Sequence, residues 1–170
     1  YIVLKPFFRR IWTSASRVVA NSQGLKRLAG RFMPALPIEV VPNGIDADEF
    51  VPGGSCRPVP GRILCVCRLV ERKGVQHLLE AMPAILERLP DASLQVVGEG
   101  DLLEGLCRRR DELGLAATVE LSGYVAHEQL SEYYAQAELY VQPSFYEGMS
   151  NTVLEAMASG LPIVATGDGG

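Results

Sequence analysis

Two glutamates, Glu147 and Glu155, lie eight residues apart in a stretch that otherwise carries mainly small and apolar side chains. The start of an expected helix lies between them and consists of Met149, Ser150, Asn151 and Thr152. The backbone amides of a helix start, together with the positive end of the helix dipole, favour an anion such as a phosphate. A carboxylate on each side can accept hydrogen bonds from hydroxyl groups. The stretch therefore predicts a site for a ligand that combines a sugar, a phosphate and a ribose.

The local pattern also indicates which elements hold these residues. A short apolar run ends at Pro143, a loop follows from Ser144 to Gly148, and a helix then continues to Gly160. Glycine and proline at its end are typical stop signals, so the expected order is strand, loop and helix. For Glu155, the alternative is a glutamate on the solvent-facing side of that helix.

Loops after three other apolar runs carry further candidates. Arg68 and Lys73 follow the first of these runs, and two permanent cations suit a diphosphate, because arginine binds two oxygens as a fork while lysine acts as a point charge. The alternative is a pair of solvated turn charges. Gly98 allows close approach of the backbone to a ligand, although a lone G-x-G is a weak signal. The segment Ser122 to Val125 either presents its backbone to a base edge or is an ordinary turn.

Apolar runs and amphipathic stretches alternate along most of the chain. Strands that are apolar throughout, joined by helices of about ten residues, are typical of a parallel sheet covered on both faces. The expected fold class is therefore α/β, with a Rossmann-like, doubly wound sheet that binds ligands at the carboxyl ends of its strands. Expected helices cover residues 6–15, 22–31, 74–89, 101–113, 128–135 and 151–159, and expected strands cover residues 17–20, 38–41, 62–67, 93–97, 118–121, 139–141 and 163–165.

Charge divides the chain into two parts. Residues 1–37 carry seven basic and no acidic side chains, whereas the remainder carries nine basic and twenty acidic ones. The Pro-rich segment Phe32 to Ile38 lies at the same point and is the expected linker. We therefore expect a domain boundary after residue 37. Because the chain starts at Tyr1 and stops directly after an apolar run, we interpret it as a fragment of a longer protein.

The cysteines and histidines show no pattern of a metal or redox site. The four cysteines lack metal-ligand spacing, which favours buried, reduced thiols of a cytosolic protein over a disulfide or a metal site. Cys65 and Cys67 lie on one expected strand, and we expect their side chains to face opposite ways. His77 and His127 have no obvious partner in the sequence, and neither is assigned a role.

The expected first helix carries an aromatic stripe beside a basic face. Phe7, Phe8, Ile11 and Trp12 recur at helical spacing. One interpretation is a stripe that packs on the core while the basic face stays in solvent. The other is contact with a membrane surface. A span across the membrane is not expected, because no apolar run approaches ~20 residues.

Several of these segments together resemble a known family. The segments, in chain order, are V-P-N-G-I-D at Val41 to Asp46, C-R-L-V-E-R-K-G at Cys67 to Gly74, V-V-G-E-G, L-S-G-Y-V and P-S-F-Y-E-G-M-S-N-T-V-L-E-A-M-A-S-G-L-P-I-V-A-T. This combination resembles the retaining glycosyltransferases of family 4, which have the two-domain GT-B fold. The resemblance runs from about Arg17 to Gly170, and its most specific parts are E-x7-E and the Arg/Lys pair. Cys67 departs from the family, which usually has glycine before the arginine.

The resemblance implies a role for each candidate residue. Arg68 and Lys73 match the cations that bind the donor diphosphate. Glu147 matches the first glutamate of E-x7-E, which contacts the transferred sugar, and Glu155 matches the second, which holds the ribose hydroxyls. Arg68, Lys73 and Glu147 are thus the expected catalytic residues. The other donor-binding positions are Gly98, Val125 through its backbone, and Met149, Ser150, Asn151 and Thr152 at the helix start.

The resemblance also implies an activity. It is the transfer of a hexosyl group from a nucleotide-diphosphate sugar to a hydroxyl of a glycan, lipid or small molecule, with retention of configuration and without a metal or other cofactor. Residues 1–37 would end the N-terminal, acceptor-side domain, and residues 38–170 would form a truncated C-terminal domain that binds the nucleotide sugar, so we expect the isolated fragment to be inactive.

The expected partners follow from this activity. They are the nucleotide-sugar donor, a glycan or lipid-linked acceptor and a peripheral contact with the membrane, but no nucleic acid, and the expected location is the cytoplasm at the inner face of the membrane. The alternative is a non-catalytic module that binds a nucleotide sugar or a partner. The complete set of Arg68, Lys73, Glu147 and Glu155 argues against it, because a site that has lost its function tends to lose charges that are costly to keep together.

Overall fold

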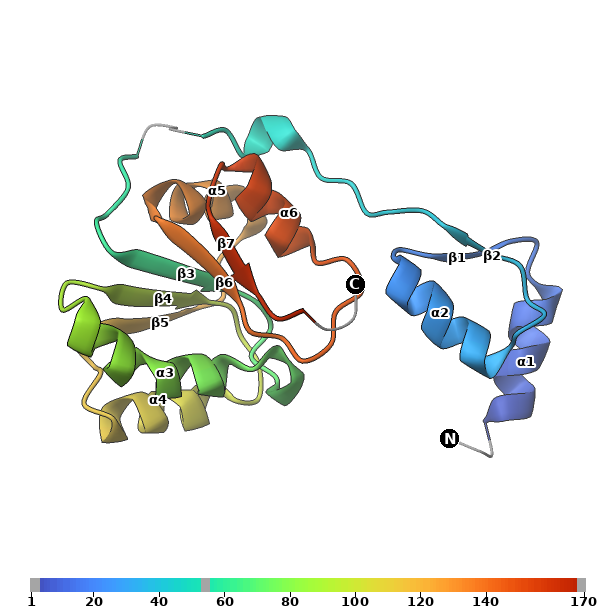
Figure 1. Ribbon diagram of the computed structural model, residues 1–170, viewed down its shortest axis with the longest axis horizontal. Helices are drawn as coiled ribbons and strands as arrows, with labels where there is room; N and C mark the ends of the chain where they lie inside the picture. The colour runs from blue at the N-terminus through green and yellow to red at the C-terminus, as the bar shows by residue number, and fades with distance from the viewer. Residues whose placement is uncertain (1–3, 53–55, 168–170) are drawn as a thin grey trace. The chain divides into compact units, whose positions relative to one another are not determined.

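The computed structural model describes residues 4–52 and 56–167, and the chain divides into two compact units (Figure 1). The first unit contains the segment up to Gly44 together with Glu147–Ser150. The second contains Ile45–Tyr146 and Asn151–Thr166. The first unit extends to residue 44, beyond the boundary expected after residue 37, because the strand at residues 38–40 pairs within it. The division into an acceptor-side and a donor-binding domain stays a prediction.

The first unit combines helices with a pair of short strands. Its elements are α1 (Lys5–Ser14), β1 (Val18–Ala20), α2 (Gln23–Phe32) and β2 (Ile38–Val40). The strands β1 and β2 are parallel, and Val18 lies opposite Ile38. The helix α2 begins after Ser22, whose hydroxyl accepts a hydrogen bond from the backbone N–H of Leu25 at 3.1 Å. This N-cap explains why the helix starts where the sequence predicts it.

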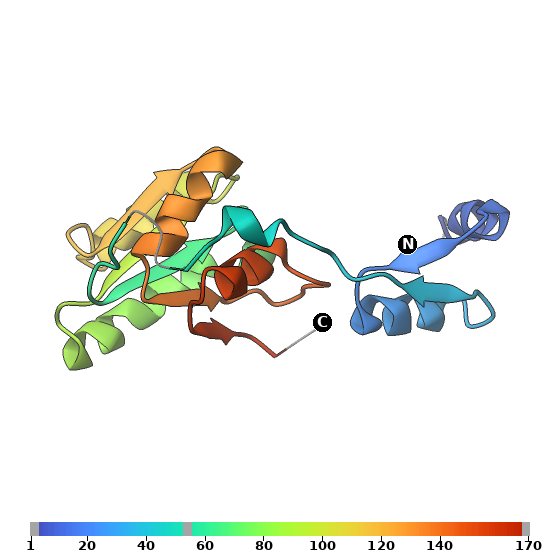
Figure 2. The same ribbon diagram turned by 90° about the horizontal axis from the view of Figure 1, so that it is seen from above.

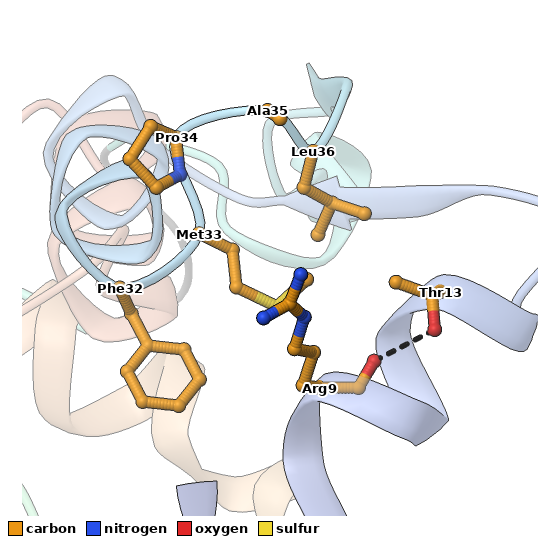
Figure 3. Close-up of a pocket in the computed structure, with 7 residues that line it drawn as sticks. All are labelled: Arg9, Thr13, Phe32, Met33, Pro34, Ala35 and Leu36. Carbon is orange, nitrogen blue, oxygen red and sulfur yellow. Dashed lines mark hydrogen bonds between the residues drawn. The ribbon is translucent and has the colours of Figure 1, made fainter. Parts of the chain in front are cut away.

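A pocket of about 300 Å³ lies between α1 and the segment that follows α2 (Figure 3). Trp12 on α1 packs edge-on against Phe32, with ring centroids 5.7 Å apart, so part of the expected aromatic stripe packs within the unit. Phe7 and Ile11 are 61% and 45% exposed, so packing within the described residues does not cover these two side chains. Contact of the stripe with a membrane stays a prediction. None of the candidate donor-binding residues lines the pocket, which is formed by Arg9, Thr13, Phe32, Met33, Pro34, Ala35 and Leu36.

The second unit is built on a parallel sheet of five strands in the order β5-β4-β3-β6-β7 (Figure 1). The strands are β3 (Arg62–Val66), β4 (Ser93–Val97), β5 (Val119–Gly123), β6 (Leu139–Gln142) and β7 (Ile163–Ala165). The helices are α3 (Val75–Arg88), α4 (Leu103–Glu112), α5 (His127–Gln136) and α6 (Asn151–Ala158), with short 3₁₀ helices η1 (Ala47–Glu49) and η2 (Glu71–Lys73). The strand order changes direction between β3 and β6, the point where doubly wound sheets bind ligands.

Helices cover both faces of this sheet, α3 and α4 on one and α5 and α6 on the other (Figure 2). Alternate residues of β3 divide between the two layers. Ile63 and Cys65 pack in the cluster that includes α3 and α4, whereas Leu64 and Val66 pack in the cluster that includes α5 and α6. Burial on both faces explains why the strand is apolar throughout, and the predicted α/β class is confirmed.

The observed helices and strands match the expected ones, with ends shifted by at most two residues. The 3₁₀ helices η1 and η2 were not expected from the sequence. Within the part of the chain that the structure describes, every helix is too short or too polar to cross a lipid bilayer.

Candidate functional site

The loop after β3 is joined to the loop after β4 by backbone hydrogen bonds. The N–H of Leu69 donates to the carbonyl oxygen of Glu99 at 2.7 Å, and the N–H of Leu102 donates to the carbonyl oxygen of Leu69 at 3.1 Å. The side chain of Leu69 is buried, whereas that of the preceding residue, Arg68, is exposed. Arg68 therefore lies on a fixed backbone at the carboxyl end of β3, at the edge of the sheet where the sequence predicts it.

Lys73 ends η2, Gly74 separates it from α3, and hydrogen bonding and close packing join the backbone around it to the loop after β6. Gly74 has φ +69°, and a β-carbon there would lie 2.1 Å from the carbonyl oxygen of Pro143, so this position requires glycine. The N–H of Phe145 donates to the carbonyl oxygen of Arg72 at 2.8 Å. These contacts fix Lys73 between the two strands at which the sheet order reverses.

Gly98 lies where the ends of β3, β4 and β5 meet. Its φ is +140°, and a β-carbon there would lie 1.8 Å from the carbonyl oxygen of Cys67. Its N–H donates to the carbonyl oxygen of Gly123 at 2.8 Å. Val125 lies two residues after Gly123. Its side chain is half-buried and packs against the core cluster under α5 and α6. The loops that carry Arg68, Lys73, Gly98 and Val125 thus lie at one edge of the sheet.

Cys65 on β3 and Cys67, the first residue after β3, correct one expectation. The Sγ atoms of Cys65 and Cys67 lie 3.9 Å apart, and both side chains pack in the core cluster that includes α3 and α4, so the expectation of opposite faces was wrong. Side chains alternate along a strand, and residues two apart therefore share a face. The hydrogen bond with Cys67 and burial raise the pKa of the Cys65 thiol, although the positive charge of Lys73 acts against them. No cluster of three or more His, Cys, Asp or Glu within residues 4–52 and 56–167 is arranged to hold a metal ion.

Glu155 on α6 is buried, with 4% of its surface exposed. The hydroxyl of Tyr134 donates to its Oε2 at 2.8 Å, and Nε2 of His127 lies 3.9 Å from its Oε1. The alternative of a solvent-facing glutamate is therefore wrong. Burial, with smaller effects of Tyr140 and Glu155, raises the pKa of Tyr134, so its hydroxyl stays protonated and donates to the carboxylate.

A buried polar network holds the first turn of α6 against β6. The hydroxyl of Tyr140 lies 2.8 Å from Oγ1 of Thr152 and 2.7 Å from Oε1 of Gln142. Nε2 of Gln142 in turn donates to Oγ of Ser144 at 2.8 Å. The Thr152 hydroxyl takes part in this network, and the contact of its backbone amide with the nucleotide sugar stays a prediction. Asn151 begins the same helix.

Glu147–Ser150, the segment with the first glutamate of the pair, belongs to the first unit. Its contact with the V-P-N-G-I-D motif is a hydrogen bond from Nδ2 of Asn43 to the carbonyl oxygen of Met149 at 3.0 Å. The predicted place of Glu147 beside Arg68 and Lys73 stays a prediction, as do the roles of Met149 and Ser150.

Sequence reasoning did not single out the residues that surround Glu155. Tyr134 lies four residues after Leu130 on the buried face of α5, where a tyrosine needs a partner for its hydroxyl, so its position carried a usable signal. His127 carried no such signal, because its proximity to Glu155 arises from two helices far apart in the sequence.

A family model described as "Glycosyl transferases group 1" matches residues 60–170. The chain belongs to this family. One relative in the group is the GDP-mannose-dependent alpha-(1-6)-phosphatidylinositol monomannoside mannosyltransferase of Mycolicibacterium smegmatis, which is 34% identical over 99% of this chain and 48% of its own length. Another is the mannosylfructose-phosphate synthase of Agrobacterium fabrum, which is 35% identical over 90% of this chain and 36% of its own length.

Solved structures agree with the group 1 assignment. The sucrose-phosphate synthase of Thermosynechococcus elongatus has a TM-score of 0.85 at 28% identity, covering 100% of this chain and 45% of that protein. The chain thus spans about half the length, or less, of the relatives it matches. The resemblance to GT-B glycosyltransferases is confirmed, whereas membership of family 4 within them stays a prediction.

Proposed function

We propose that this chain supplies the donor-binding part of a retaining glycosyltransferase. The enzyme would transfer a hexosyl group from a nucleotide-diphosphate sugar to an acceptor hydroxyl. The observation that carries the proposal is the rigid joining of the loops after β3, β4 and β6, which presents Arg68 and Lys73 at the reversal point of the sheet. A diphosphate is the ligand that two permanent cations on such an edge suit best.

The proposed reaction builds negative charge on the leaving group. The bond between the anomeric carbon and the diphosphate oxygen breaks, while the acceptor oxygen forms the new bond on the same face and its proton passes to the departing phosphate. Positive groups fixed at the place where charge develops lower the barrier, and each such donor contributes ~3 kcal/mol. Arg68 and Lys73 take this role, supported by the backbone amides at the start of α6.

The two glutamates have different proposed roles. Glu155 is buried and oriented by Tyr134, which suits a carboxylate that binds the ribose hydroxyls rather than one that carries out chemistry. Glu147 is proposed to orient the transferred sugar and to act electrostatically. Because the two carboxylates contact different parts of the donor, the paired-carboxylate mechanism of glycoside hydrolases does not apply. No metal or other cofactor is part of the proposal.

The acceptor and the location are proposed from the relatives. The name of one relative specifies a phosphatidylinositol monomannoside acceptor, which favours a lipid-linked glycan for this protein, although the mannosylfructose-phosphate synthase shows that small-molecule acceptors occur among similar proteins. A lipid-linked acceptor would bring the protein to the cytoplasmic face of a membrane. GDP-mannose is the first donor to test, because the name of that mannosyltransferase specifies it.

Titration calorimetry of the complete protein against GDP, UDP and ADP tests the proposal. We expect one nucleotide to bind with a clear preference, and binding to weaken in Arg68→Ala and in Glu155→Ala. Arg108→Ala is the matched control, because Arg108 is exposed on α4, its side chain 72% accessible. Binding that is unchanged in Arg68→Ala and Glu155→Ala, or equally reduced in Arg108→Ala, would contradict the donor site.

A further inference from the structure

The two oxygens of the Glu155 carboxylate have different surroundings. Oε2 accepts the hydrogen bond from Tyr134, whereas Oε1 lies 3.9 Å from Nε2 of His127. The side chain of Glu155 is 5% exposed, and that of His127 is 58% exposed. The buried carboxylate therefore meets solvent-accessible surface at the imidazole.

The distance between Oε1 and Nε2 is informative. At 3.9 Å the two atoms are too far apart for a direct hydrogen bond. A single oxygen about 2.8 Å from each atom fits between them. A hydroxyl group has the matching chemistry, because it can donate to the carboxylate while it accepts from an imidazole N–H.

The surrounding residues hold this pair in place. The ring of Phe50, which is 2% exposed, lies 5.8 Å from the ring of His127 and 5.6 Å from that of Tyr134. The hydroxyl of Tyr134 lies 2.8 Å from the Glu155 carboxylate and 3.2 Å from the backbone carbonyl oxygen of Thr152, so its one proton is directed at two acceptors on α6. Glu155 and His127 are therefore presented on a preformed surface.

We propose that His127 is a ligand-binding residue that shares one ribose hydroxyl of the donor with Glu155, and that it contributes to selectivity for ribonucleotides over deoxyribonucleotides. This rests on the proposed function, in which Glu155 binds the ribose. His127 begins α5 only two residues after Val125, whose backbone is the proposed contact of the base. The start of α5 would thus contact the nucleoside at two neighbouring positions.

The test uses calorimetry on the complete protein with its preferred nucleoside diphosphate and with the 2′-deoxy and 3′-deoxy forms. We expect His127→Ala to weaken binding of the ribonucleotide about three- to tenfold, the effect of one hydrogen bond, and to leave binding of one deoxy form unchanged. Glu128→Ala is the control for a disturbed helix start, because Glu128 is the adjacent, exposed residue of α5. Equal weakening of all three ligands, or of none, would overturn the proposal.

Glu155→Gln in the same titration separates this proposal from the donor site itself. The glutamine keeps an acceptor for Tyr134 but changes the group that faces the hydroxyl. If Glu155→Gln reduces the preference for the ribonucleotide and His127→Ala does not, the role of His127 is wrong and the donor site stands. If the wild-type protein binds the ribonucleotide and both deoxy forms equally well, and Glu155→Gln binds all three like the wild-type protein, both the ribose contact of Glu155 and the role of His127 are wrong.

Discussion

A β-carbon on Gly98 would lie 1.8 Å from the carbonyl oxygen of Cys67, so the ends of β3 and β4 approach each other more closely than any other residue type permits. The backbone at Gly98 also has φ +140°, a conformation that side chains with a β-carbon rarely adopt. We expect Gly98→Ala to lower the free energy of unfolding by about 3 kcal/mol or more, because steric overlap and backbone strain add. Denaturant unfolding of the complete protein measures this.

Gly105→Ala is the matched comparison for Gly98→Ala. Gly105 lies on α4, and a β-carbon there would contact nothing beyond its chain neighbours and the nearby backbone of its own helix within 4 Å. Alanine there should stabilise the protein by about 0.5–1 kcal/mol, because it favours the helix. A Gly98→Ala protein as stable as Gly105→Ala would show that the close approach at Cys67 does not exist.

Tyr140→Phe should destabilise the protein by about 1–3 kcal/mol, because it removes the buried hydroxyl that contacts both Thr152 and Gln142 in the network under α6. The hydroxyl lies within 2.8 Å of both Thr152 Oγ1 and Gln142 Oε1. A double-mutant cycle with Thr152→Val checks the cause. The two substitutions should together cost less than the sum of their separate effects, since they act on one network. Strict additivity would mean that the two hydroxyls do not interact.

Much of the second unit followed from the sequence. The strand β3 carries buried apolar side chains on both faces, and this pattern directly predicts a sheet covered by helices on both sides. The error at Cys65 and Cys67 came from misapplying the two-residue period of a strand, not from missing information. The compact units divide after residue 44 rather than 37, since a change of charge does not show that β2 pairs with β1.

The site was predicted less completely. The positions of Arg68, Lys73 and Gly98 at strand ends follow from topology, because parallel strands bring their carboxyl ends to one edge. The partners of Glu155 cannot be predicted from topology. Tyr134 and His127 reach it through the packing of α5 on α6, which no local sequence pattern specifies. Buried polar pairs of this kind depend on tertiary structure and appear in the sequence as isolated residues.

Stability should fall at alkaline pH, because burial raises the pKa of Tyr134 and of Tyr140 above the ordinary value of 10.0. Above pH 10 the unfolded chain releases these protons while the folded chain retains them, so stability decreases as pH rises. The ordinary pKa is 10.0 for tyrosine and 9.0 for the Cys65 thiol. At a pH below both values, these groups should not change the free energy of unfolding. The free energy of unfolding should therefore be level from about pH 7 to 9 and then decline, by up to ~1.4 kcal/mol per pH unit for each group.

Unfolding experiments across this pH range in Tyr134→Phe identify the group responsible. The variant should show a shallower decline than wild type above pH 10. Tyr124→Phe is the control, because Tyr124 is 70% exposed. If Tyr124→Phe flattens the profile as much as Tyr134→Phe does, burial of Tyr134 is not the cause of the decline.

Arg68→Ala and Lys73→Ala should each reduce kcat about 100-fold or more, since a donor aimed at developing charge is worth ~3 kcal/mol. Binding of the donor should change less than turnover, because the charge on the leaving group increases towards the transition state. Glu155→Ala should show the reverse, with weaker nucleotide binding as its main effect. Product formation from GDP-mannose and other nucleotide sugars by the complete protein, with separate kcat and KM, measures all three.

Arg72→Ala separates placed charge from total charge in this loop. Arg72 is exposed in η2 directly before Lys73, and its contact with Phe145 in the loop after β6 uses its backbone carbonyl rather than its side chain. We therefore expect Arg72→Ala to retain nearly all of the wild-type kcat. If it loses as much turnover as Arg68→Ala, the loop acts through its overall positive potential, and the specific roles proposed for Arg68 and Lys73 are wrong.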